Sequence, residues 1–137
     1  MAFDDRYLFV CMGNVDRSVA GESIFRELFG ARGFDVGKLN ERKGHDFYVG
    51  SAGLIVSNAN VMNGSVQLTN EMARKVGTVF SIDALVTKGL VKSYNVPGRK
   101  IVQLDIEDGR SLLIEEEAQS LYGEFRRKLT DYLSGKV

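Results

Sequence analysis

Short apolar runs alternate along the chain with stretches whose apolar residues repeat at helical spacing. Residues 7–11 (YLFVC) form a continuous apolar run that stops at Gly13, which is typical of a strand buried on both faces. From Ser18 the apolar residues follow a helical period, and Gly30 and Gly33 end the predicted helix. The chain is therefore expected to begin with a buried strand, a short connection and a helix.

The rest of the chain continues this alternation. Further strands are predicted at residues 47–52, 79–86 and 100–106, and further helices at residues 62–76 and 114–132. The polar connection 36–46 is predicted to be a surface loop, and His45 within it has no motif around it and is assigned no role. Strands that alternate with helices predict one α/β domain over residues 1–137, an open parallel sheet of about four strands with helices on both faces.

Composition and charge exclude several classes of protein. The 137 residues hold 18 Lys plus Arg and 18 Asp plus Glu, so the net charge is zero and no basic face for nucleic acid or a membrane surface is indicated. No apolar stretch approaches the roughly 20 residues of a membrane helix, and the acidic N-terminus does not fit a signal peptide. One cysteine and one histidine form neither an intrachain disulfide nor a zinc cluster. We expect a cytoplasmic protein with no metal, no organic cofactor, and no nucleic-acid or membrane partner.

The connection between the first strand and the first helix has the sequence Cys11-Met12-Gly13-Asn14-Val15-Asp16-Arg17-Ser18. In open α/β sheets, ligands bind beyond the carboxyl ends of the strands, where the N–H groups of a following helix favour an anion. A cysteine and an arginine separated by five residues can surround one phosphate, with the thiolate beneath phosphorus and the guanidinium on two oxygens. The helix dipole, the loop amides and Arg17 also favour the nucleophilic thiolate. This phosphate loop, residues 11–18, is therefore predicted to bind an oxyanion.

Three motifs together resemble the low-molecular-weight protein tyrosine phosphatase family. Residues 8–28 (LFVCMGNVDRSVAGESIFREL) are similar to the family's strand, C-x-G-N-x-C-R-S loop and following helix. Residues 49–53 (VGSAG) resemble its S-A-G strand, and residues 102–109 (VQLDIEDG) resemble the segment that carries its general acid, normally Asp-Pro. The motifs follow one another in the family's order across nearly the whole chain. The resemblance implies the family's fold and a phosphatase activity.

The resemblance also implies a role for each matching residue. Cys11 would be the nucleophile that forms a phosphocysteine, and Arg17 would bind phosphate and stabilise the transition state. Asp108 would protonate the leaving oxygen and then activate water. Asp105 is the alternative acid, because the residues around it fix the register only weakly. The other residues expected to bind substrate or shape the loop are Met12, Gly13, Asn14, Val15, Asp16, Ser18 and Ser51.

Asp16 stands where the family has a second cysteine. If its carboxylate faces inward, a bound anion at about 4 Å and an effective dielectric constant of about 20 meets a repulsion on the order of 4 kcal/mol. If the carboxylate faces outward and pairs with another group, the loop works normally. The sequence leaves both orientations open.

Two further departures concern the cleft and the first helix. Gly109 and Arg110 replace the family's Pro-aromatic pair, and no aromatic residue lies between Tyr48 and Phe80, so the wall that holds a phenyl ring is missing. Arg110 would suit an acidic substrate or be an ordinary solvated charge. Gly21 stands where alanine is usual, and it is interpreted as drift that loosens the first helical turn.

The leading interpretation is a cysteine-dependent phosphomonoester hydrolase that acts on a phosphorylated protein or a small phosphomonoester. The alternative is a phosphate- or phosphopeptide-binding homologue in which Asp16 and the missing aromatic wall have weakened or abolished catalysis. Arsenate reduction is a third interpretation, since related reductases share the loop, but their disulfide relay needs cysteines that this chain lacks. The sequence does not indicate the oligomeric state.

Overall fold

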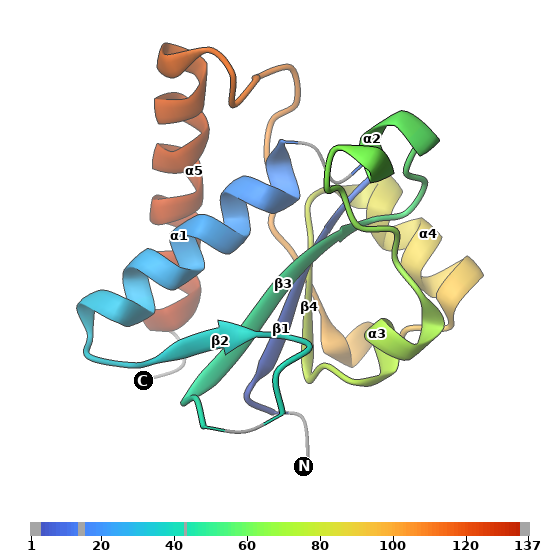
Figure 1. Cartoon of the computed structure of the whole chain (residues 1–137), viewed down its shortest axis with the longest axis horizontal. Coiled ribbons are helices and arrows are strands. Elements are labelled where there is room, and N and C mark those ends of the chain that lie inside the picture. The colour runs from blue at the N-terminus through green and yellow to red at the C-terminus, as the bar shows by residue number, and fades with distance from the viewer. Residues whose placement is uncertain (1–3, 14–15, 43, 135–137) are drawn as a thin grey trace.

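A five-stranded parallel sheet forms the centre of the computed structural model, which describes residues 4–13, 16–42 and 44–134 (Figure 1). The strands are β1 (Arg6–Cys11), β2 (Val36–Lys38), β3 (Phe47–Gly53), β4 (Thr78–Ser81) and β5 (Ile101–Gln103), in the order β2-β3-β1-β4-β5. The predicted parallel α/β sheet is confirmed, with five strands. The additional strand, β2, is a three-residue edge strand inside the connection that was predicted to be a loop.

Helices cover both faces of the sheet, as predicted. Phe9 and Cys11 of β1 pack in one apolar cluster with α1 (Arg17–Ala31) and α5 (Glu115–Ser134). Leu8 and Val10 alternate with them and pack in a second cluster on the opposite face. Residues of α3 (Asn70–Arg74) and α4 (Ala84–Tyr94) pack in this second cluster. The helix α2 (Asn58–Met62) follows β3 and has no buried residue, and a 3-10 turn (Gly98–Lys100) precedes β5.

Three predicted elements between residues 62 and 106 are wrong in their extent. The helix expected at residues 62–76 is two five-residue helices, because Gly64 has a φ of +95° and Thr69 starts α3 anew by accepting a hydrogen bond from the Met72 N–H. The strand expected at residues 79–86 ends at Ser81, and α4 follows it. The strand predicted at 100–106 is likewise only the three residues of β5.

Gly21 allows α1 to lie close to the sheet and to α5. A Cβ atom at this position would lie 2.5 Å from the Phe9 ring and 2.8 Å from the Phe125 ring, and both rings are fully buried. The interpretation of Gly21 as drift is therefore wrong, since only glycine fits this approach.

His45 makes specific contacts in the β2–β3 connection. Its Nδ1 lies 2.8 Å from the Asp35 carboxylate and its Nε2 lies 2.6 Å from the Glu41 carboxylate. The imidazole also covers Gly37, where a Cβ atom would lie 2.3 Å from the ring. The sequence analysis assigned His45 no role, and the structure shows that its ring links two carboxylates across this surface connection.

No helix in the described part of the chain combines the length and the apolar character needed to cross a membrane.

Candidate active site

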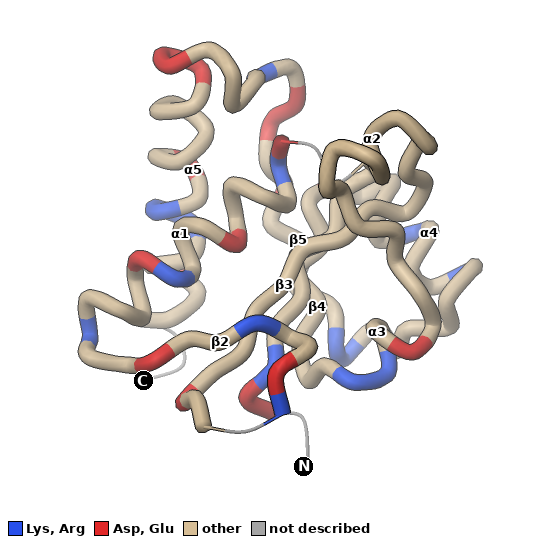
Figure 2. The backbone as a smooth tube through the Cα atoms, viewed as in Figure 1, with Lys and Arg blue, Asp and Glu red and all other residues tan. Residues whose placement is uncertain are grey.

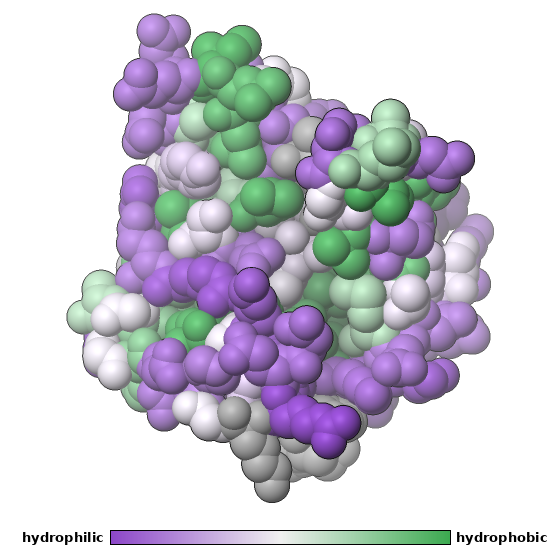
Figure 3. Space-filling model, viewed as in Figure 1, coloured by the Kyte–Doolittle hydropathy of each residue, from purple (hydrophilic) through white to green (hydrophobic). Residues whose placement is uncertain are grey.

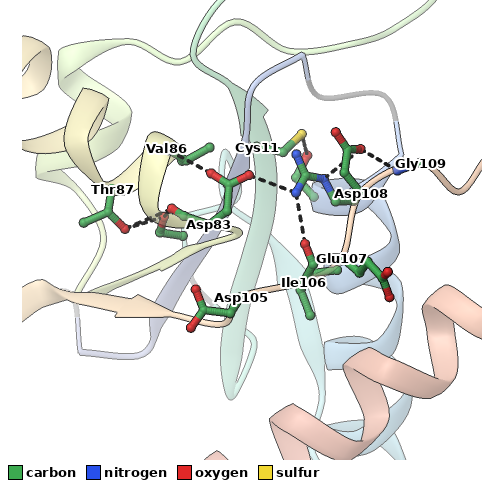
Figure 4. A network of polar contacts seen from close by, with 12 residues as sticks. Cys11, Asp83, Val86, Thr87, Asp105, Ile106, Glu107, Asp108 and Gly109 are labelled. Atoms are coloured by element: carbon green, nitrogen blue, oxygen red, sulfur yellow. Dashed lines mark hydrogen bonds and ion pairs between the residues drawn. The ribbon is translucent and has the colours of Figure 1, made fainter.

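The chemically important side chains gather at the edge of the sheet where the parallel strands end. Cys11 is the last residue of β1, Arg17 is the first residue of α1, and Asp83 and Asp108 follow β4 and β5 (Figure 4). Because β1 is the central strand, Cys11 lies between the segments that leave its neighbours. Residues distant in sequence are thus brought together as expected for a ligand site in an open α/β sheet.

Cys11 lies in a sheltered position beside a hydroxyl group. The residue is 4% exposed, and its Sγ lies 3.0 Å from the Oγ of Ser18, which is fully buried in the first turn of α1. A serine hydroxyl can donate a hydrogen bond to a thiolate. The Ser18 hydroxyl is therefore placed to hydrogen-bond the Cys11 sulfur.

The segment after β3 is joined to the phosphate loop through backbone hydrogen bonds. The Leu54 N–H donates to the Cys11 carbonyl and the Ile55 N–H donates to the Met12 carbonyl. Met12 and Gly13 are partly buried beyond β1. Ser51 lies within β3 opposite Phe9, two residues before Gly53, which pairs with Cys11. Asn14 and Val15 lie outside the described residues, so their roles stay predictions.

The Arg17 guanidinium is held from two sides. Its Nη1 donates to the Asp83 carboxylate at 3.0 Å and to the Ile106 carbonyl at 3.1 Å, and its Nε lies 3.6 Å from the Asp108 carboxylate. The side chain is only 11% exposed. These contacts orient a fork of N–H donors at the start of α1, where a bound oxyanion is favoured.

Asp83 is a site residue that the sequence analysis missed. Its Oδ1 accepts a hydrogen bond from the Val86 N–H and so caps α4, while its Oδ2 accepts from Arg17. The signal in the sequence is an aspartate followed by apolar residues at helical spacing, Val86 and Leu90, which marks a helix start. That signal was hidden because the same residues were included in a predicted strand.

The two candidate acids lie differently. Asp108 is 84% exposed, and its carboxylate points toward Arg17 on the side where the Cys11 sulfur lies (Figure 4). Asp105 has a φ of +54°, its carboxylate accepts a hydrogen bond from the Gln103 side chain, and it points away from Cys11 in the same view. Of the two aspartates, Asp108 is therefore the one that lies beside Arg17 and faces the site.

Asp16 is turned toward the segment before α5. Its Oδ1 accepts a hydrogen bond from the Leu112 N–H at 2.9 Å, and its own carbonyl accepts from the Ala20 N–H in the first turn of α1. The sequence left open whether the Asp16 carboxylate faces the anion site or faces outward and pairs with another group. The structure shows the paired orientation. The paired group is the backbone amide of Leu112.

Arg110 holds the Asp108 segment on α5. Its guanidinium pairs with Glu124 and donates to the Ser120 hydroxyl and the Glu107 carbonyl, and the side chain is 16% exposed. It is therefore neither a solvated charge nor a group directed at a substrate, and both sequence-based interpretations are corrected. Figure 2 shows this charged segment, between β5 and α5, beside the charged start of α1.

Exposed aliphatic side chains occur on the segments that leave the site end of the sheet. Seven large apolar residues are exposed on the segments that follow β3, β4 and β5: Ile55, Val61, Met62, Val66, Leu85, Leu113 and Ile114. Figure 3 shows apolar side chains over the start of α5 and over α2. No charged residue occurs in the sequence between Asp46 and Glu71, which is the uncharged stretch through α2 in Figure 2.

The described residues contain no group of three or more His, Cys, Asp or Glu side chains placed to hold a metal ion. The groups that converge at the site are a thiol, a hydroxyl, a guanidinium and carboxylates.

Comparison with known proteins identifies the fold. No family model matches the chain, and no curated protein matches its sequence. Solved structures match over nearly the whole chain. Wzb from Vibrio vulnificus, in complex with benzylphosphonate, has a TM-score of 0.71 at 17% identity and covers 97% of this chain and 99% of its own. A low-molecular-weight protein tyrosine phosphatase from T. tengcongensis has a TM-score of 0.65 at 24% identity, over 93% of this chain and 98% of its own.

A variant of the YwlE arginine phosphatase with a phosphorylated active-site serine has a TM-score of 0.67 at 18% identity, over 94% of this chain and 95% of its own. At these identities the likeness establishes the arrangement of helices and strands. In its fold, this chain is therefore similar to the low-molecular-weight protein tyrosine phosphatases, as its motifs predict.

Proposed function

We propose that the protein is a cysteine-dependent phosphomonoester hydrolase. The observation that carries the proposal is the convergence of Cys11, Arg17 and Asp108 at one sheet edge, with the Asp108 carboxylate 3.6 Å from the Arg17 Nε. A thiol nucleophile, a phosphate-binding guanidinium and an exposed carboxyl are the groups that phosphoryl transfer through cysteine requires. The proposed substrate is a phosphate monoester, carried by a phosphorylated protein or by a small molecule.

In the first step the Cys11 thiolate attacks phosphorus. A sulfur–phosphorus bond forms while the bond from phosphorus to the leaving oxygen breaks, and that oxygen takes the proton of the Asp108 carboxyl. Arg17 binds two of the phosphate oxygens and stabilises the charge that they carry in the transition state. Ser18, 3.0 Å from the sulfur, stabilises the thiolate before attack.

In the second step water releases the phosphate. The Asp108 carboxylate accepts a proton from water, whose oxygen attacks phosphorus as the sulfur–phosphorus bond breaks. Inorganic phosphate leaves, the Cys11 thiolate returns, and Asp108 again holds a proton. The cycle consumes one water for each ester and requires no further reactant.

Structures with the same fold support this chemistry. One contains benzylphosphonate, another contains sulphate, and a third carries a phosphorylated active-site serine. Matching proteins include some named as tyrosine phosphatases and one named as an arginine phosphatase. Their ligands are oxyanions of the kind that the loop from Cys11 to Ser18 is proposed to bind here.

The test is aryl-phosphate hydrolysis from about pH 4.5 to about pH 8 by wild type and Cys11→Ser, with folding checked by circular dichroism. Wild type is expected to turn over, and Cys11→Ser is expected to lose turnover while it still binds inorganic phosphate. Cys11→Ser activity near that of wild type contradicts the mechanism. Phosphate binding by a wild type that hydrolyses no ester supports the non-catalytic binding protein instead.

A further inference from the structure

The phosphate loop is joined to a segment almost a hundred residues away. The Asp16 carboxylate accepts the Leu112 N–H at 2.9 Å, and the two residues are 96 positions apart in the sequence. Asp16 immediately precedes Arg17, while Leu112 lies in the segment that carries Asp108 from β5 to α5. One hydrogen bond therefore connects the phosphate-binding part of the site with the part that supplies the acid.

The far side of the same segment is fixed by α5. Lys128 donates to the carbonyls of Leu104 and Asp105, Glu124 accepts from the Glu107 N–H, and Glu117 accepts from the Ser111 N–H. These contacts attach one side of the segment to α5. The other side of the segment contacts the phosphate loop.

Among the described residues of the phosphate loop, Arg17 and Asp16 make those contacts. A bound substrate affects the two residues differently. Arg17 reaches Asp108 and the Ile106 carbonyl, but its guanidinium is also the proposed phosphate ligand. A bound phosphate competes with Asp108 for it. The Asp16 contact involves neither the guanidinium nor the Cys11 sulfur, so a bound phosphate does not compete for it.

We propose that Asp16 is a positioning residue that sets the place of the Asp108 carboxyl over the phosphate loop through its hydrogen bond to Leu112. The inference rests on the proposed function, since it assigns Asp16 to the reaction catalysed there. It also explains why a carboxylate is found beside an anion site, since the Asp16 side chain accepts a hydrogen bond from the Leu112 N–H.

The test separates the hydrogen bond from the charge. Asp16→Asn keeps an oxygen acceptor for Leu112 and removes the charge, whereas Asp16→Ala removes both. Asp46→Ala is the matched control, because Asp46 also accepts a backbone N–H, that of Asp35, at the opposite end of β3. Values of kcat/KM are measured for p-nitrophenyl phosphate and phenyl phosphate, since phenolate leaves poorly and depends more on the acid.

Asp16→Ala is expected to lose about tenfold in kcat/KM for phenyl phosphate and about twofold or less for p-nitrophenyl phosphate. Asp16→Asn and Asp46→Ala are expected to keep the wild-type ratio between the esters. Inhibition by inorganic phosphate is expected to stay unchanged in all three. Amide hydrogen exchange at Leu112 is expected to speed up in Asp16→Ala and to remain slow in Asp16→Asn.

An unchanged ester ratio in Asp16→Ala, or unchanged exchange at Leu112, overturns the inference while the phosphatase stands. Tighter phosphate binding in both Asp16 variants also overturns it, because that result assigns Asp16 to charge repulsion. A wild type that hydrolyses neither ester overturns the proposed function, and the positioning role of Asp16 with it.

Discussion

The Asp83 carboxylate joins the first turn of α4 to the Arg17 guanidinium. One of its oxygens accepts the Val86 N–H at 2.9 Å and the other accepts from Arg17 Nη1 at 3.0 Å. The cap fixes the carboxylate, and the fixed carboxylate orients the guanidinium. The position of α4 is thus transmitted to Arg17, the proposed phosphate-binding residue at the start of α1.

Substitution of Asp83 should separate these two effects. Asp83→Asn keeps an acceptor for Val86 but loses the charge that orients Arg17, so kcat/KM for an aryl phosphate should fall about tenfold with little loss of stability. Asp83→Ala should lose in addition about 1 kcal/mol of unfolding free energy, the usual value of a helix cap. Kinetics and urea denaturation measure the two effects.

Thr69→Ala is the control for the cap alone, because Thr69 caps α3 by accepting the Met72 N–H and does not contact Arg17. It should lose similar stability with unchanged kcat/KM. If Thr69→Ala and Asp83→Asn have the same kinetic effect, Asp83 does not act through Arg17.

The local sequence was sufficient to predict the site residues that lie within a single strand–loop–helix unit. Cys11, Arg17 and Ser18 are close in sequence, and a buried strand followed by a helix forces them to one sheet edge. Asp83 was not predicted, because its role depends on where β4 ends relative to β1. The orientation of Asp16 was also unpredictable from local pattern, since its partner is a backbone amide 96 residues away.

The same division holds for the fold. The amphipathic α5 was predicted because its apolar residues keep a helical period over several turns. The strand β1 was predicted because its apolar residues form one continuous run. The five-residue helices α2 and α3 and the three-residue β2 are too short to show a period. Gly21 was misinterpreted because the Phe9 and Phe125 rings that exclude a side chain there come from other elements.

Gly21→Ala should destabilise the protein although alanine favours a helix. The added methyl would meet the buried Phe9 and Phe125 rings at 2.5 and 2.8 Å, and such overpacking costs about 1–3 kcal/mol, against a gain of about 1 kcal/mol from helix propensity. Gly30→Ala is the matched control in the same helix, since nothing lies within 4 Å of its added Cβ atom. Gly30→Ala should be neutral or stabilising in urea denaturation, and equal behaviour of the two variants would falsify the packing argument.

Glu124→Gln should weaken the attachment of the Asp108 segment to α5. Glu124 is 11% exposed and receives Arg110, Lys128 and the Glu107 N–H, so loss of its charge should cost about 2 kcal/mol of unfolding free energy. Glu27→Gln is the comparison, because the Glu27–Arg126 pair is exposed and should be worth less than about 1 kcal/mol. Similar losses in the two variants would contradict the view that burial makes the Glu124 contacts stronger.

The Glu124 contacts should also make the stability of the protein fall on acidification. Burial acts to raise the pKa of Glu124, but hydrogen bonds from Arg110, the Glu107 N–H and Lys128 outweigh it and lower this pKa below its ordinary value. The group therefore contributes stability above its unfolded pKa and loses that contribution as the pH falls through the lower folded pKa. Glu124→Gln should show a shallower fall in stability on acidification than wild type.

His45 should make stability depend on pH near neutrality, with the opposite sign. Hydrogen bonds to the Glu41 carboxylate and then to the Asp35 carboxylate raise the pKa of His45 above its ordinary value of 6.5. The raised pKa means that the charged ring is favoured in the folded state. Its stabilising contribution is complete below the unfolded pKa and disappears as the pH rises through the folded pKa.

Two measurements check this pH dependence. The first is an NMR titration of the imidazole, whose signals need no assignment because His45 is the only histidine in the sequence. The NMR titration should give a pKa above 6.5. Urea midpoints at about pH 5.5 and about pH 9 should differ more in wild type than in His45→Gln, which cannot be protonated in this range. A titration midpoint below the ordinary value, or an equal pH dependence in His45→Gln, would show that the two carboxylates do not hold a charged ring between them.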